Sequence, residues 1–159
     1  MSYRDPVELS FLASKKEKAS ALPPEWYQEI DGKRILRLLL CVGLNGTGKT
    51  KMIEALQYLR MLAVYKPEKP TDRPAYRPFL LDEQSRYEPS ELSLTYYINN
   101  TCHYYYIKVS EKRIEEEILK QISPNILLYH RFYNSETDTV SIKFGSDSDI
   151  SKSTQQALK

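Results

Sequence analysis

The sequence predicts an α/β fold in which a strand, a glycine-rich loop and a helix precede an antiparallel β meander. Three observations support this prediction. Residues 34–42 form an almost purely apolar run, residues 49–63 carry apolar side chains at helical spacing, and polar and apolar side chains alternate from about Phe79 onward. The first pattern is typical of a buried strand, the second of an amphipathic helix and the third of half-buried strands.

The apolar run at 34–42 has the length and composition of a strand that is buried on both faces, as in a parallel sheet. Residues 7–12, further upstream, are compatible with a short strand. Cys41 and Cys102 have neither CxxC spacing nor a nearby set of metal ligands, so we interpret both as reduced thiols, with one inside a buried strand.

The helix is predicted at 49–63, where apolar side chains recur at helical spacing, at Met52, Leu56, Leu59 and Ala63. Proline residues after this segment end the helix and keep the following chain extended, because proline lacks the backbone N–H that a helix requires.

The second half of the chain predicts paired strands. Alternation in 92–98 and in 103–109, separated by a turn at 99–101, is typical of a β-hairpin with one apolar and one tyrosine-rich face. Residues 126–133 and 139–144 predict a second strand pair. Residues 113–122 fit either a helix, with Ile114, Ile118 and Ile122 on one side, or a strand, in which Ile114, Glu116 and Ile118 would share one face.

The chemistry of the chain is concentrated in one loop. Three of the five glycines lie within residues 43–48, and residues 43–50 fit the pattern G-x-x-x-x-G-K-S/T of a phosphate-binding loop, also called Walker A. The predicted nucleotide-binding residues are therefore Gly43, Leu44, Asn45, Gly46, Thr47, Gly48, Lys49 and Thr50.

Each fixed position of this motif has a physical role. Backbone N–H groups and the positive end of the following helix hold the phosphates, and the glycines allow the backbone to approach them closely. Lys49 supplies a positive charge to the β- and γ-phosphates. The Thr50 hydroxyl is the predicted protein ligand of Mg²⁺, which also takes phosphate oxygens and water.

Other candidate residues favour structural roles. We interpret His103 and His130 as structural histidines within strands, and residues 115–117, three consecutive glutamates, as a solvated face rather than a metal site. The thirteen tyrosines fit sheet packing better than a base-stacking platform. Trp26 and Tyr27 precede the loop and are weak candidates for contact with an adenine ring.

Bulk composition excludes several classes of protein. The 23 basic and 21 acidic residues give a net charge of +2, which does not by itself indicate DNA or an anionic membrane as a partner. No apolar run approaches the roughly 20 residues that span a bilayer, and the N-terminus is too polar for a signal peptide. We therefore expect a cytoplasmic protein.

The loop GLNGTGKT, with Asn45 and Gly46 inside it, resembles the G-x-N-G-x-G-K-S/T form of ABC-like ATPases of the RecF, structural-maintenance-of-chromosomes and OLD kind. Three further segments resemble the N-terminal part of bacterial AAA-type, ABC-like ATP-binding proteins, so the resemblance covers most of residues 7–145. They are VELSFLASK at 7–15, KMIEALQYLR at 51–60, and PFLLDEQSRYEPSELSLTYYINNTCHYYYIKVSEKRIEEEIL at 78–119.

This resemblance implies ATP and Mg²⁺ as ligands, and ATP hydrolysis by the complete protein or assembly. It favours a strand at 113–122, since an antiparallel β region follows the P-loop helix in that family. It also implies a homodimer or a C-terminal ATPase half as partner, with an effector or nuclease partner in DNA maintenance or anti-phage defence.

The chain also departs from the family pattern. Residues 80–83 read Leu-Leu-Asp-Glu, but only three apolar residues precede the acidic pair, so we expect a loop rather than a Walker B strand. No LSGGQ-like signature or late switch histidine is evident. We therefore expect weak or absent turnover in this chain alone, because hydrolysis needs a group that orients water.

The predicted architecture is one incomplete nucleotide-binding domain. Residues 1–80 are its P-loop-bearing part, 81–145 its antiparallel β region, and 146–159 a polar tail. Two alternatives remain open at this point: a non-catalytic, β-rich interaction module with a remnant P-loop, and a P-loop kinase in which Arg73, Arg77 and Arg86 would belong to a lid.

Overall fold

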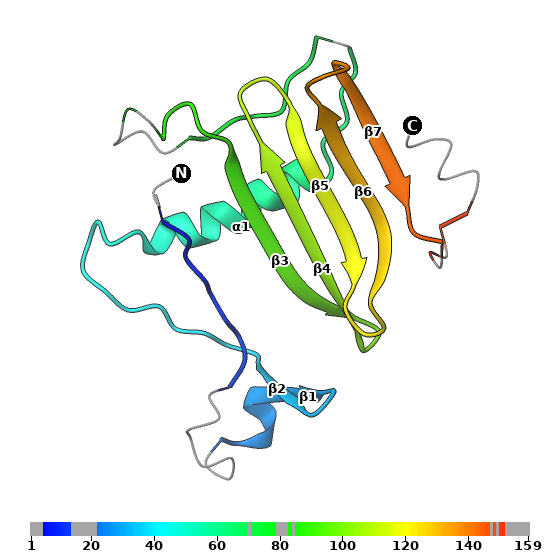
Figure 1. Cartoon of the computed structure of the whole chain (residues 1–159). Coiled ribbons are helices and arrows are strands. Elements are labelled where there is room, and N and C mark those ends of the chain that lie inside the picture. Colours follow the sequence, from blue (N-terminus) through cyan, green and yellow to red (C-terminus); the bar gives the residue numbers. More distant parts are fainter. Residues whose placement is uncertain are drawn as a thin grey trace. The chain divides into compact units, whose positions relative to one another are not determined.

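The computed structural model describes residues 5–13, 22–69, 71–78, 83, 85–146, 148 and 150–151. The chain separates into two compact units. Asp5–Lys49 forms the smaller unit, and the larger one contains the chain from Thr50 onward (Figure 1). Residues 79–82, which include most of the Leu-Leu-Asp-Glu segment, lie outside the described residues.

The larger unit is built on a five-stranded antiparallel meander in which every strand pairs with its neighbours in sequence (Figure 1). This confirms the predicted β meander. A two-residue turn at Asn99 and Asn100, both with positive φ of 49° and 63°, joins the first two strands, as in tight hairpins. The strands are β3 (Ser90–Ile98), β4 (Thr101–Val109), β5 (Ile114–Gln121), β6 (Ile126–Asn134) and β7 (Thr139–Phe144).

Strand β5 resolves the segment that the sequence left ambiguous. A bulge interrupts its pairing with β4, so that Val109 pairs with Ile114 but Lys108 pairs with Glu116. Because the bulge adds one residue on β5, Ile114 and Glu116 face opposite sides of the sheet. The expectation that these two residues would share a face was therefore wrong.

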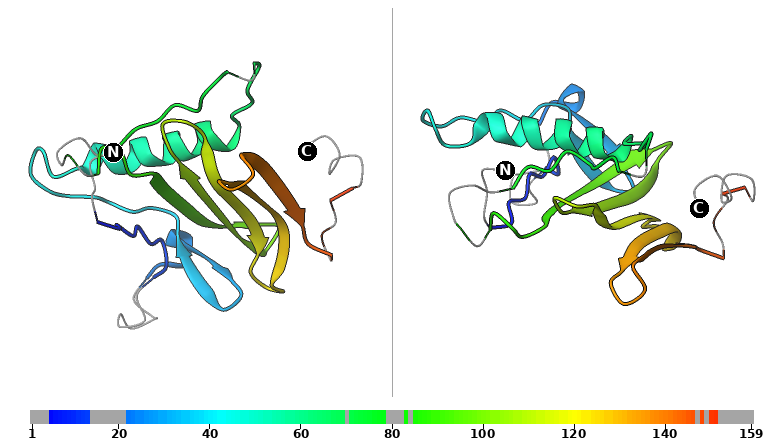
Figure 2. Two further views of the ribbon diagram at one scale, coloured as in Figure 1. Left: turned by 45° about the horizontal axis from the view of Figure 1, so that its top comes forward. Right: turned by 90° about the horizontal axis from the view of Figure 1, so that it is seen from above.

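Helix α1 (Lys49–Ala63) has the predicted bounds and lies along one face of the sheet (Figure 2). The buried side chains of α1 pack in one apolar cluster with those of β4 and β5. Burying each such side chain contributes roughly 1.5–3 kcal/mol. The described part of the unit contains no second helix, and α1 is on the face that carries the apolar cluster. The cluster consists of Tyr58, Leu59, Leu62, Tyr105, Ile107, Val109 and Ile114.

The smaller unit is a short hairpin with an extended segment beside it. The 3-10 helix η1 (Pro24–Trp26) leads into β1 (Tyr27–Ile30), which pairs with β2 (Lys33–Leu36). The predicted strand at 7–12 is reduced to one bridge, between Leu12 and Ile35.

The predicted strand at 34–42 was wrong over most of its length. Strand β2 ends at Leu36, and the side chains of Leu38, Leu40 and Val42 are 80%, 81% and 85% exposed. A strand of this composition is buried only when neighbouring strands and covering layers flank it. The described part of this unit supplies one partner strand, β1, which pairs with the run only as far as Leu36.

Both cysteines are free, and one lies buried inside a strand, as predicted. Cys102, in β4, is buried, whereas Cys41 lies in the exposed apolar run. Among the described residues, no helix is both long and apolar enough to span a membrane.

Candidate functional site

The loop at 43–48 leads directly into α1, which begins at Lys49. The backbone at Gly46 and Gly48 has φ of +83° and +88°, a conformation that residues with a side chain rarely adopt. A Cβ atom at Gly43 would lie 3.0 Å from the Thr47 hydroxyl oxygen. All three glycines of the motif therefore occupy positions where a side chain would be strained or crowded.

The side chain of Lys49 folds back over the loop. Its Nζ donates hydrogen bonds to the carbonyl oxygens of Gly43, at 2.7 Å, and Leu44, at 2.6 Å. The Thr47 hydroxyl donates to the same Leu44 oxygen at 2.8 Å. The two carbonyl oxygens accept hydrogen bonds from the ammonium group, as phosphate oxygens could. The Lys49 side chain is therefore held at the loop.

The N-terminal end of α1 suits an anion. Its first turn contains no acidic residue, so no carboxylate competes for the positive end of the helix dipole. Thr50 is exposed in that turn. The ammonium group of Lys51 forms an ion pair of 2.7 Å with Glu54, one turn further along the helix. Lys49 is thus the cation that the first turn of α1 places on the loop.

The predicted nucleotide-binding residues form one continuous loop that runs into the first turn of α1. Asn45 lies in the turn at the loop tip. No group of three or more His, Cys, Asp or Glu side chains in the described ranges could hold a metal ion. Magnesium held by a threonine hydroxyl and phosphate oxygens does not need such a group. Arg77, a proposed lid residue, lies over the ring of Tyr58 at 5.6 Å.

One feature that the sequence did not reveal is a buried polar cluster on the face of the sheet that carries α1. Glu117 is only 6% exposed, so the prediction of a solvated face at 115–117 was wrong for this residue. Its carboxylate accepts hydrogen bonds from the hydroxyls of Tyr105, at 2.7 Å, and Tyr129, at 2.9 Å. Arg131 Nη2 lies 2.5 Å from the other carboxylate oxygen.

The two phenols of this cluster have raised pKa values. Burial, followed by the charge of Glu117, raises the pKa of both Tyr105 and Tyr129 well above the usual value. Both phenols therefore stay protonated and act as donors. Nε of Arg131 is buried and has no hydrogen-bond partner among the described residues. The cluster ties β4, β5 and β6 together from inside the sheet.

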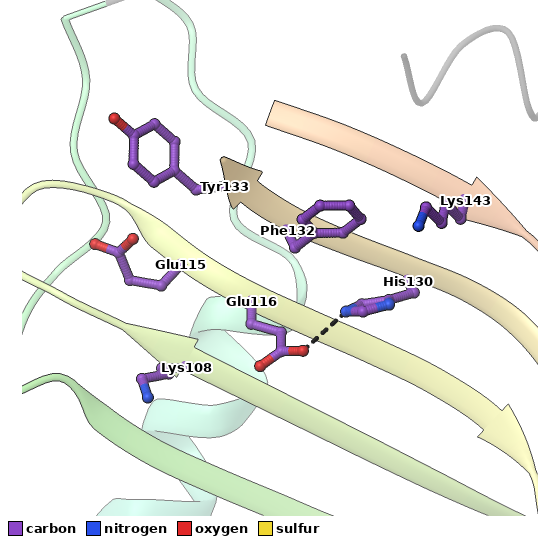
Figure 3. Close-up of a pocket in the computed structure, with 7 residues that line it drawn as sticks. All are labelled: Lys108, Glu115, Glu116, His130, Phe132, Tyr133 and Lys143. Carbon is purple, nitrogen blue, oxygen red and sulfur yellow. Dashed lines mark hydrogen bonds and ion pairs between the residues drawn. The ribbon is translucent and has the colours of Figure 1, made fainter. Parts of the chain in front are cut away.

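The two histidines have the structural partners expected of them. Nδ1 of His103 lies 3.0 Å from the Thr101 carbonyl oxygen, and its ring stacks on Tyr96 with centroids 5.5 Å apart. Nε2 of His130 lies 2.8 Å from a carboxylate oxygen of Glu116. The His130–Glu116 pair borders a shallow depression on the opposite face of the sheet from α1 (Figure 3).

Comparisons of the chain with protein-family models, with curated proteins and with solved structures found no match.

Proposed function

We propose that this chain binds ATP together with Mg²⁺ through residues 43–50, as the N-terminal, P-loop-bearing part of an ABC-like AAA-type ATPase. The observation that carries the proposal is the position of Lys49 at the start of α1, with its ammonium group held on the Gly43 and Leu44 carbonyl oxygens. An ammonium group so placed can exchange carbonyl oxygens for phosphate oxygens by a small side-chain movement.

The remaining loop residues have consistent roles in this proposal. The left-handed backbone at Gly46 and Gly48 curves the chain so that successive N–H groups can converge on an anion. The Thr50 hydroxyl would be the protein ligand of a magnesium ion bridging to the phosphates. Mg²⁺ neutralises phosphate charge when bound, and the chain supplies the loop that positions it.

Hydrolysis belongs to the complete protein or assembly in this proposal. A water molecule must be oriented by an acceptor group, and the first turn of α1 offers no carboxylate for this role. We therefore propose weak or absent turnover for this chain alone. A homodimer or a C-terminal ATPase half would supply the missing groups, in a cytoplasmic setting. DNA maintenance or anti-phage defence, with an effector or nuclease partner, is the process that the sequence resemblance suggests.

Isothermal titration calorimetry with Mg-ATP tests the binding proposal. We expect saturable binding to the wild-type chain, loss of that binding in Lys49→Ala, and retention in Lys51→Ala. The two lysines are two positions apart in the same helical turn, and only Lys49 contacts the loop, so Lys51→Ala is a matched control. Equal binding by both variants, or none by a folded wild type, would refute the proposal and favour a remnant loop on an interaction module.

A further inference from the structure

The face of the sheet opposite α1 carries two lysines that lie on aromatic rings. Nζ of Lys120 is 5.1 Å from the ring centroid of Tyr104, and Nζ of Lys143 is 5.0 Å from that of Phe132. Strand pairing sets this arrangement. Tyr104 is opposite Lys120 between β4 and β5, and Lys143 is opposite His130, two residues from Phe132, between β6 and β7.

The carboxylates of this face that lie near the lysines already have partners. Lys108 Nζ is 2.9 Å from Glu91, and His130 Nε2 is 2.8 Å from Glu116. Glu115, which also lines the depression of this face, lies 3.9 Å from Arg113 Nε. Among the described residues, neither Lys120 nor Lys143 lies within ion-pair distance of a carboxylate. The three lysines of this face and the three glutamates near them balance in charge, and the two ammonium groups that have no counter-ion among the described residues are the ones on aromatic rings.

We propose that this face binds single-stranded nucleic acid, with unpaired bases stacked on Tyr104 and Phe132 and phosphates held by Lys120 and Lys143. An aromatic ring with an adjacent cation offers both contacts that an unpaired nucleotide needs, a stacking surface for the base and a positive charge for the backbone. The proposal is independent of the P-loop and does not rest on nucleotide binding there.

The shape of the face fits this ligand. A shallow depression of about 340 Å³ lies at the Phe132 end, and its lining also includes Lys108, Glu115, Glu116, His130, Tyr133 and Lys143 (Figure 3). This volume is at the lower end of the range for small-ligand sites, which suits a single nucleotide. Tyr104 and Phe132 lie two strands and four residue levels apart, a distance on the order of 16 Å, so one extended strand can reach both rings.

The composition of the face argues against the main alternative, a protein partner. Surfaces that dock onto another protein carry few charged residues at their centre. Here charged groups separate the aromatic rings, and the Tyr106 side chain is hydrogen-bonded to Glu91. A duplex is disfavoured because its bases are already stacked, so only the two phosphate contacts would remain.

Fluorescence anisotropy with labelled oligo-dT and oligo-U of about 12 nucleotides tests the proposal, since single-strand sites of this type cover about 4–16 nucleotides. We expect Tyr104→Leu and Phe132→Leu each to weaken binding by about fivefold or more, because leucine keeps apolar volume but cannot stack. The slope of log affinity against log salt should be about −1.4 for two phosphate contacts, and about −0.7 in Lys120→Gln or Lys143→Gln. The DNA and RNA arms show which nucleic acid is preferred, and binding of either supports the proposal.

Matched controls are available in exposed positions elsewhere. Tyr87 is 79% exposed and Lys112 is exposed in a turn, so Tyr87→Leu and Lys112→Gln should leave the affinity unchanged. Lys49→Ala excludes capture of the oligonucleotide by the P-loop, and should also bind normally. Thermal unfolding of each variant confirms that the fold is retained.

Three results would overturn the proposal. The first is no change in anisotropy with either oligonucleotide at about 100 μM protein, the weak limit of non-specific binding; the face would then be a protein-packing surface. The second is equal affinity for a duplex of the same length. The third is binding that the leucine and glutamine variants of this face leave unchanged. None of these results bears on Mg-ATP binding, which the calorimetric titration tests separately.

Discussion

The side-chain ammonium group of Lys49 donates a hydrogen bond of 2.7 Å to the backbone carbonyl oxygen of Gly43, the first residue of the loop. A second bond, to Leu44, leaves the ammonium group with two carbonyl acceptors in the absence of phosphate. The loop is thus closed on itself by the residue that the motif assigns to the phosphates, and this relationship makes the proposed function testable by stability as well as by binding.

Mg-ATP should raise the thermal stability of the wild-type chain. At a ligand concentration about a hundred times the dissociation constant, binding adds roughly 2.7 kcal/mol, which corresponds to about 5–10 °C for a chain of this size. Differential scanning fluorimetry should show this rise in the wild type and in Lys51→Ala, but not in Lys49→Ala. A rise of equal size in Lys49→Ala would place the nucleotide elsewhere.

Gly46 should be sensitive to substitution for a purely conformational reason. A Cβ atom at this position would meet no atom within 4 Å, yet the backbone has a φ of +83°. Gly46→Ala should therefore weaken Mg-ATP binding by roughly 1–2 kcal/mol, or about 5- to 30-fold, and Gly46→Asn by less, because asparagine tolerates positive φ better than alanine. Calorimetric titration of the two variants measures the difference. Equal losses would indicate that side-chain bulk, and not the backbone, decides the affinity.

Glu117 should contribute more to folding stability than its neighbour Glu116. Glu117→Gln removes the charge that pairs with Arg131 and weakens the acceptor for two buried phenols, at a cost of roughly 2 kcal/mol or more. Glu116 and its partner His130 are both partly exposed to solvent, which weakens their ion pair. Glu116→Gln should therefore lower the free energy of unfolding by less than about 1 kcal/mol. Urea denaturation gives both values. Similar small losses in the two variants would show that the buried cluster is not stabilising.

The buried phenols predict a loss of stability at alkaline pH. Burial and the Glu117 carboxylate raise the pKa of Tyr105 and Tyr129 in the folded chain. Above pH 10 the unfolded tyrosine releases a proton that the folded one retains. The contribution of each tyrosine is therefore complete below pH 10, and falls by about 1.4 kcal/mol for each pH unit above it.

The matched variant for this pH dependence is Tyr129→Phe, which removes one of the titrating groups. Denaturant titrations at pH 9, 10 and 11 should show a slope that is less steep in the variant by about one proton. Tyr87→Phe, at a position that is 79% exposed, should leave the wild-type slope unchanged. An unaltered slope in Tyr129→Phe would mean that this phenol ionises as readily in the folded chain as in the unfolded one.

The local elements of the fold were predictable because the information for them is local. Helical spacing defined α1, alternation of polar and apolar residues defined the β3–β4 hairpin, and the two asparagines at 99 and 100 supplied the left-handed turn between them. The phosphate loop was equally evident, since its residues are contiguous and each has a role that depends on residue type.

The sequence by itself therefore determined helix α1, the strand pairs β3–β4 and β6–β7, and the position of the loop. Tertiary structure alone decided which face each β5 residue presents, because one bulge between β4 and β5 reverses the alternation and turns Glu117 toward Tyr105 and Arg131. Tertiary structure also left the apolar run after Leu36 exposed and outside any strand. Burial of a strand depends on the strands and layers that surround it, and not on its own composition.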